Sequence, residues 1–158
     1  TTARALSMHG RNSAVVHGDS IRQFIAKRIA GQVRTGLGYL NGAAVSSNYI
    51  EAGYDLVVYE YVFEDASHVA KFVDNLTVDC PVFLFTLWAA CKTVESRESE
   101  RRDRHTLGPR VTECWQSMER HLGDFATIID TENRSVDEVV SSIVRKIESN
   151  EGRVSALH

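Results

Sequence analysis

The chain has 158 residues, of which 43% are hydrophobic and 25% are charged, and its formal net charge is −3 at pH 7. This length is sufficient for one domain with a sizeable core. The slightly acidic balance, without a basic block or tail, argues against a general nucleic-acid binder but not against an enzyme that acts on a nucleotide.

No apolar segment is long enough to span a bilayer, so the sequence predicts no membrane association. The three cysteines, Cys80, Cys91 and Cys114, are odd in number and lack CxxC or Cys/His metal spacing. This pattern argues against a disulfide framework or a zinc site and favours the reducing cytoplasm.

Short apolar runs alternate with helix-like stretches, which predicts an α/β fold with a parallel sheet covered by helices on both faces. In the first half of the chain we expect the helix Thr1–Met8, the strand Ala14–Val16, a helix from a Ser20 cap to about Ile29, a looser glycine-rich stretch Gly31–Gly38, a helix at about Tyr39–Ala52, the strand Asp55–Val62 and the helix Ala66–Leu76.

In the second half we expect the strand Val82–Trp88, buried on both faces, the helix Lys92–Arg104, the helix Pro109–His121 and the strand Phe125–Ile129. The last helix follows Ser135-Val136-Asp137-Glu138, whose Ser and Glu have the spacing of a capping box. Its valines and isoleucines recur at helical spacing, which indicates a structural role. The tail after Asn150 is expected to fray.

Three arginines, Arg97, Arg101 and Arg104, recur at i, i+4 and i+7, so one helix would present them on a single face. Guanidinium forks bind phosphate oxygens in bidentate fashion, which suits a polyphosphate ligand. Taken alone, however, the acidic residues between them make a solvated, salt-bridged surface helix the better explanation.

The ends of the predicted strands carry further candidates, because ligands of open parallel sheets bind at the carboxyl ends of the strands. Asp19 could take a hydroxyl proton while Arg22, one turn later, holds the substrate; a helix N-cap explains Asp19 equally well. Glu60 could order magnesium or its water, or be an exposed edge residue. The loop Asp130–Asn133 could contact a purine or merely connect two elements.

The sequence resembles the P-loop small-molecule kinases in Ala3-Arg4-Ala5-Leu6, AVVHGDSIR, VVYEYVF and ESRESERRDR. It is most similar to the chloramphenicol phosphotransferase group, with gluconate kinase and tunicamycin-resistance-type ATP-binding proteins as neighbours. The lid pattern Arg-Glu-x-x-Arg-x-Asp-Arg fits Arg97–Arg104 at every fixed position, and of the acidic pair before Val-Phe only Glu60 is kept. The GDxxR motif is less specific, since adenylylsulfate kinases and polynucleotide kinases also contain it.

The resemblance spans nearly the whole chain and implies a three-layer α/β fold, a nucleoside-monophosphate-kinase-like P-loop NTPase. Residues 1–150 would form the kinase core, with substrate-binding helices at about 20–53 and a lid at about 92–110, and residues 151–158 would form a flexible tail. One departure is large, because no GxxxxGK[ST] phosphate-binding loop occurs in the sequence. Since Thr1-Thr2-Ala3-Arg4-Ala5-Leu6 fits the continuation after that loop, we expect the sequence to begin just behind its own first strand and loop.

The resemblance further implies phosphoryl transfer from ATP, with Mg²⁺, to a hydroxyl of a small molecule. Asp19 would be the base, Arg22 would hold the substrate and Glu60 would contact the substrate or the metal. The lid arginines Arg97, Arg101 and Arg104 would stabilise the transferring phosphate. Residues expected to bind the nucleotide are Thr1, Arg97, Arg101 and Asn133.

Two other functions stay open at this point, a polynucleotide 5′-hydroxyl kinase and a non-catalytic nucleotide-binding module. The acidic balance speaks against the first, which needs a basic groove for the strand. The acceptor is equally open among an antibiotic, a sugar acid and a nucleoside, and so is the formation of a homo-oligomer. His17, Gln23, Tyr39 and Asn41 could line the acceptor pocket, although each is more often structural or at the surface.

Overall fold

The computed structural model describes residues 2–27, 36–100, 108–123 and 127–154. The chain divides into two compact units, Thr1–Val82 with Val154–His158, and Phe83–Arg153. Each unit combines one pair of parallel strands with helices, so the α/β class expected from the sequence is confirmed. A third pair of short strands, β3 (Val82–Phe83) and β6 (Arg153–Val154), lies where the chain passes between the units.

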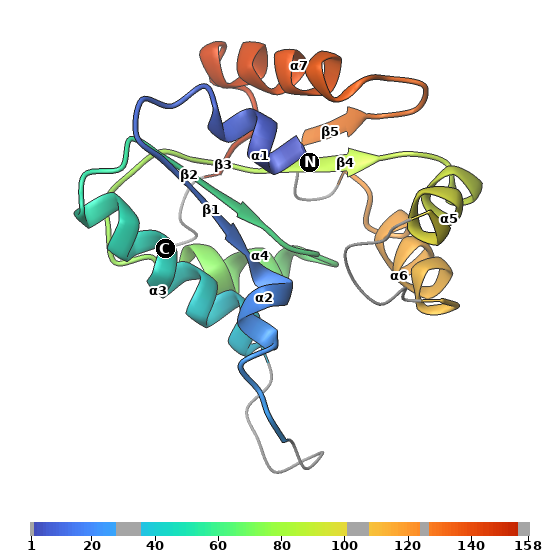
Figure 1. Ribbon diagram of the computed structural model, residues 1–158, viewed down its shortest axis with the longest axis horizontal. Coiled ribbons are helices and arrows are strands. Elements are labelled where there is room, and N and C mark those ends of the chain that lie inside the picture. Colours follow the sequence, from blue (N-terminus) through green and yellow to red (C-terminus); the bar gives the residue numbers. More distant parts are fainter. Residues whose placement is uncertain (1, 28–35, 101–107, 124–126, 155–158) are drawn as a thin grey trace. The chain divides into compact units, whose positions relative to one another are not determined.

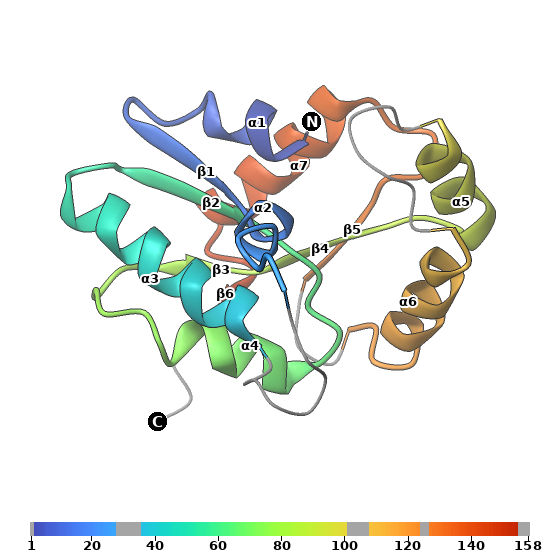
Figure 2. The same cartoon turned by 60° about the horizontal axis from the view of Figure 1, so that its bottom comes forward.

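The first unit is built on the parallel pair β1 (Ser13–His17) and β2 (Leu56–Glu60) (Figure 1). Its helices are α1 (Thr2–Ser7), α2 (Gly18–Arg22), α3 (Leu37–Glu51) and α4 (Ala66–Val73). α1 packs against both strands, and α3 packs against α4 and both strands (Figure 2). The helix α2 follows β1 without a loop, which fixes its residues at the carboxyl end of that strand.

An aromatic cluster forms the core of this unit. Tyr39 and Ala43 of α3 and Phe72 of α4 are buried, and Tyr59, Tyr61 and Phe63 pack against them. The Tyr59 ring stacks on Phe72 with ring centroids 4.6 Å apart. Two hydroxyls tie α3 to the β2 segment: Tyr59 donates to the carbonyl of Gly38 at 3.0 Å, and Tyr39 donates to that of Val62 at 2.8 Å. Core packing therefore accounts for the presence of these tyrosines.

The second unit is built on the parallel pair β4 (Phe85–Trp88) and β5 (Thr127–Asp130). Its helices are α5 (Cys91–Ser99), α6 (Arg110–Glu119) and α7 (Val136–Glu148). α7 packs against β5, and its Val139, Val140 and Ile143 are each 3% exposed. The predicted capping box is present, since Ser135 accepts from the Glu138 amide while Glu138 accepts from the Ser135 amide. Both the helix and its structural role are therefore confirmed.

Several expected boundaries are wrong. The helix after β1 begins at Gly18 and ends at Arg22, with His17 rather than Ser20 at its N-cap. The run Val82–Trp88 is interrupted at Leu84, and Leu87 is 43% exposed, so this run is not buried on both faces. In the described part of the chain β4 pairs only with β5, so its other edge has no strand partner there. Within the tail expected after Asn150, Arg153 and Val154 form the short strand β6.

The helix expected over Lys92–Arg104 begins at Cys91 and ends at Ser99, with Glu100 as C-cap. Of its three arginines only Arg97 is described, and Arg101 and Arg104 lie outside the described residues. The same holds for Thr1 and for most of the glycine-rich stretch Gly31–Gly38. Among the described helices, none is long and apolar enough to cross a membrane.

Candidate functional site

The carboxyl ends of β1 and β2 bring three candidate residues together in the first unit. The register of the two strands places His17 directly opposite Glu60. The His17 Nδ1 lies 3.2 Å from the Glu60 Oε2, and the two side chains are 33% and 50% exposed. Asp19 follows two residues after His17, in the first turn of α2. His17 and Glu60 therefore meet at the edge where parallel sheets bind their ligands, and Asp19 follows β1 at the same edge.

Asp19 is exposed and is not the N-cap of α2. His17 takes that position, and no side chain caps the helix. Among the described residues the Asp19 carboxylate has neither a hydrogen bond nor an ion pair, so it can accept a proton or a hydrogen bond from a ligand. Capping, the alternative that the sequence left open, does not explain this residue.

The surroundings of Asp19 are shaped by two glycines and two tyrosines. A side chain at Gly18 would meet Tyr61, because an added Cβ would lie 2.3 Å from its Cδ2. Burial raises the pKa of Tyr59, and the nearby Tyr61, Tyr39 and Asp19 raise it further. The hydroxyl of Tyr59 therefore stays protonated and donates to Gly38 rather than acting as a base. Arg22 is exposed at the end of α2, one turn beyond Asp19.

Glu60 was expected to contact a metal or the substrate. One of its oxygens faces His17, and the other has no partner among the described residues. Within that same part of the chain, no group of three or more His, Cys, Asp or Glu side chains could hold a metal ion. From the sequence, His17 was expected at most to line the acceptor pocket. Its contact with Glu60 depends on the strand register, which no local sequence pattern reveals.

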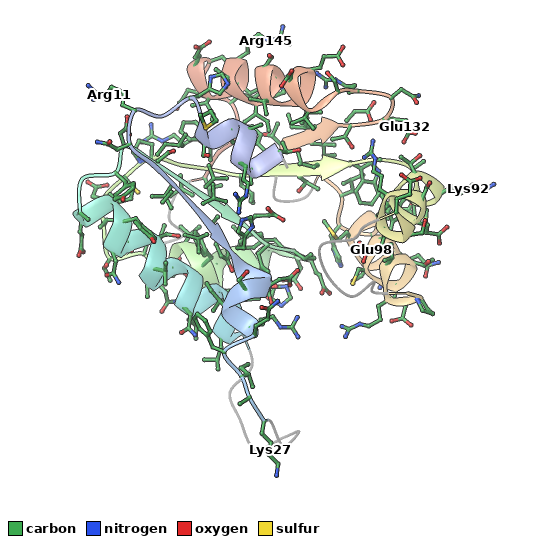
Figure 3. All side chains as sticks on the ribbon, viewed as in Figure 1. Arg11, Lys27, Lys92, Glu98, Glu132 and Arg145 are labelled. Atoms are coloured by element: carbon green, nitrogen blue, oxygen red, sulfur yellow. The ribbon has the colours of Figure 1, made fainter. Side chains whose placement is uncertain are left out.

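A second candidate site lies in the other unit, in an open surface depression of about 500 Å³ between α5 and the loop after β5, hereafter called the cavity. It is lined by Lys92, Thr93, Ser96, Arg97, Glu132, Asn133 and Arg134. Figure 3 labels Lys92 on α5 and Glu132 on the loop. Two residues expected to bind the nucleotide, Arg97 and Asn133, thus line one cavity.

The Arg97 guanidinium is held by the loop. Its Nη1 donates to the hydroxyl of Thr131 at 2.9 Å, and its Nη2 donates to the carbonyl of the same residue at 2.8 Å. Thr131 is 8% exposed, and its hydroxyl donates to the Trp88 carbonyl at 2.9 Å. This bidentate arrangement fixes the plane of the guanidinium and leaves three of its five N–H groups outside the two bonds to Thr131.

The cavity has a positive balance, with three cationic side chains and one carboxylate. Arg134 donates to the carbonyls of Asp130 and Glu138. Hydrogen bonds from Ser135 hold the pKa of the Glu138 carboxylate below its ordinary value, and the charge of Arg134 helps to do so. The hydroxyl of Thr93 and the amide of Ala90 hold the pKa of Glu132 below its ordinary value, and Arg97 contributes to this lowering. Glu132 is therefore ionised at neutral pH.

The backbone of the loop is shaped around the cavity. The Glu132 amide donates to the Asp130 Oδ1 at 2.8 Å, which closes a tight turn. Asn133 adopts a left-handed conformation with φ of 51°, which is uncommon for residues other than glycine and best tolerated by Asn and Asp. The sequence identified this loop by its position after a strand, but its hydrogen bonds to α5 join residues more than thirty positions apart.

The fold is similar to that of a tunicamycin resistance protein from Deinococcus radiodurans. The two share 21% sequence identity with a TM-score of 0.63 over 98% of this chain and 92% of that chain. At this identity the similarity concerns the fold alone. It agrees with the sequence motifs, since tunicamycin-resistance-type proteins are among the groups they resemble. No protein-family model and no curated protein sequence matches the chain.

Proposed function

We propose that the protein transfers the γ-phosphoryl group of a nucleoside triphosphate to a hydroxyl of a small molecule in the cytoplasm. The observation that carries this proposal is Asp19, an exposed carboxylate at the carboxyl end of β1 that neither caps α2 nor pairs with another described residue. An exposed carboxylate in the first turn of α2, at the edge where α/β sheets bind ligands, is a candidate general base.

Phosphoryl transfer asks a protein mainly to position the reactants and to neutralise charge. Asp19 would accept the hydrogen bond of the acceptor hydroxyl and take its proton as the oxygen bonds to phosphorus. Arg22, one turn later, would hold the acceptor. Glu60 would orient the acceptor through its free oxygen, or contact the magnesium ion that neutralises the phosphates when bound. Since magnesium on a nucleotide keeps most of its ligands as phosphates and water, one protein carboxylate is compatible with it.

The nucleotide base would lie in the cavity of the second unit, against the face of the Arg97 guanidinium and beside Asn133. The fixed plane of Arg97 supports this placement, because a planar cation stacks on aromatic rings. Arg101 and Thr1 are proposed to contact the phosphates, and Arg104 to stabilise the transferring group with them. ATP is the donor we would test first.

Replacing Asp19 with Asn tests the base directly, since the side chains have the same shape but the amide cannot take the proton. We expect Asp19→Asn to lower kcat by about 10²–10⁴-fold, the usual contribution of a general base, while ATP binding is retained. Asp74→Asn, the same change at an exposed position of the same unit, is the matched control and should leave turnover unchanged. Turnover near wild type in Asp19→Asn would exclude Asp19 as the base.

The acceptor is best identified with a panel assayed by transfer of labelled γ-phosphate. The panel should contain tunicamycin, phenicols, aminoglycosides, sugar acids and nucleosides, because the structural neighbour and the sequence resemblance both point to antibiotic resistance. An oligonucleotide with a 5′-hydroxyl belongs in the same panel. Transfer to the oligonucleotide alone would favour a polynucleotide kinase.

A second candidate function is a non-catalytic nucleotide-binding module. It would be favoured if the gene carries no GxxxxGK[ST] loop before Thr1, because this loop holds the β- and γ-phosphates in P-loop kinases. Reading the gene upstream of Thr1 discriminates the two candidates: a strand followed by that motif supports the kinase. ATP binding without transfer to any acceptor, in the full-length gene product, would support the module.

A further inference from the structure

Glu132 caps a helix that is distant in sequence. Helix α5 has Ala90 at its N-cap, and no side chain of its own caps it. Instead the Oε2 of Glu132 accepts from the Ala90 amide at 3.0 Å, and its Oε1 accepts from the Thr93 hydroxyl at 2.7 Å. In α7 the same task is done locally, since Glu138 accepts from the amide of Ser135 and from its hydroxyl, both at 2.8 Å.

The neighbouring residue Thr131 binds the same helix one turn further along α5. Thr93 and Arg97 are four positions apart, so they lie on one face of α5. Glu132 binds the first of these side chains and Thr131 binds the second, through the two hydrogen bonds from the guanidinium. Two consecutive loop residues therefore attach to two consecutive turns of α5.

The arrangement is held from the loop side as well. The Thr131 hydroxyl donates to Trp88 at the end of β4, and the Glu132 amide is bonded to Asp130 at the end of β5. Both loop residues are thus tied to the ends of paired strands. Helix α5 also packs against α6, whose Thr112 donates to Glu95, but the loop is what attaches to its first turn and to Arg97.

The structure assigns Glu132 as a positioning residue: through its bonds to the first turn of α5 it sets where the Arg97 guanidinium stands in the cavity. Glu132 is not proposed to take part in the chemical step. The effect of this positioning on nucleotide binding rests on the proposed function. The positioning of Arg97 itself does not.

Glu132→Gln tests the assignment, because Gln keeps the shape but loses the charge. Its matched control is Glu138→Gln, which removes the charge from an equivalent pair of capping bonds on α7, outside the cavity. In the full-length protein we expect the Kd for ATP to rise about tenfold in Glu132→Gln, the effect of weakening one hydrogen bond to a charged group. It should stay within about twofold in Glu138→Gln, which should also leave kcat at saturating ATP unchanged.

Side-chain NMR provides a measurement that needs no ligand. A guanidinium held in two hydrogen bonds shows hindered rotation and separate Nη signals, and in Glu132→Gln those of Arg97 should broaden or merge. In Glu138→Gln they should match the wild type. Unchanged Arg97 signals in Glu132→Gln would overturn the assignment.

Thr93→Val provides a second route in case Glu132→Gln folds poorly. It removes only the hydroxyl that Glu132 binds, so it should also broaden the Arg97 Nη signals. In the double variant the broadening should be less than the sum of the effects of the two single changes. Full additivity would contradict coupling between the pair. If the wild type does not bind ATP, the proposed function fails, whereas the Arg97 signals still decide the positioning role.

Discussion

Gly42 lies in the second turn of α3 under the ring of Tyr59. A Cβ at this position would lie 2.5 Å from the Cε2 and Cζ of that ring and 2.8 Å from its hydroxyl. Ordinary contacts begin near 3.4 Å, so the Gly42→Ala variant requires a movement of about 1 Å. The ring cannot move easily, because it stacks on Phe72 and its hydroxyl is bonded to Gly38.

Two opposing effects decide the stability of this variant. Alanine is a better helix former than glycine by about 1 kcal/mol in a helix interior. Overpacking of a core costs about 1–3 kcal/mol, and a ring fixed by stacking and a hydrogen bond belongs at the upper end of that range. We therefore expect Gly42→Ala to lower the free energy of unfolding by about 1–2 kcal/mol.

Chemical denaturation followed by tyrosine absorbance measures this, since both tryptophans, Trp88 and Trp115, lie in the other unit. Asn41→Ala, an exposed change in the same helix, is the control for helix propensity and should be slightly stabilising. In a Tyr59→Leu background the ring is gone, and Gly42→Ala should become stabilising by about 1 kcal/mol. The same sign for Gly42→Ala in both backgrounds would refute the packing argument.

Three further outcomes are expected. The folded-state pKa of Glu132 lies below its ordinary value of 4.5, so its contribution to stability is present above that value and is lost as pH falls through the lower folded pKa. The free energies of unfolding of wild type and Glu132→Gln, measured as pH is lowered, should therefore converge in that range, and a constant difference between them would contradict this. Ser135→Ala should lower the stability of the second unit by about 1 kcal/mol in denaturation followed by tryptophan fluorescence, and an unchanged midpoint would show that α7 does not depend on its cap. Tyr39→Phe removes the bond to Val62 and should cost about 1 kcal/mol in the first unit, in contrast to Tyr54→Phe, whose hydroxyl has no hydrogen-bond partner in the described residues.

Most elements were predictable where their signals are local. The helix α7 follows from a capping box within four residues and an apolar stripe, and α3 from a long helical stretch that ends before Gly53, whose φ is +91°. The N-cap of α2 was predicted three residues too late, because a serine that could cap a helix lies inside it instead, and the helix ends at Arg22 rather than near Ile29. The run Val82–Trp88 was predicted as one strand because its composition is uniformly apolar, and composition does not reveal the break at Leu84.

For the candidate site, the sequence proposed Asp19 from its place after a strand but could not distinguish a cap from a catalyst. The structure excludes Asp19 as the N-cap, because His17 occupies that position in α2. The sequence also proposed Arg97 and Asn133 separately, and their presence in one cavity needed the contact between α5 and the loop after β5. The expected roles of Arg101, Arg104 and Thr1 stay predictions.

By itself, the sequence determined the alternation of strands and helices, the capping of α7 and the candidate residues at the strand ends, because each depends on neighbours within one or two turns. Only the tertiary structure decided that His17 meets Glu60, that Thr131 fixes Arg97 and that Glu132 caps a helix 42 residues earlier. The physical reason is that such contacts depend on strand register and helix packing, which bring together groups that no local pattern connects.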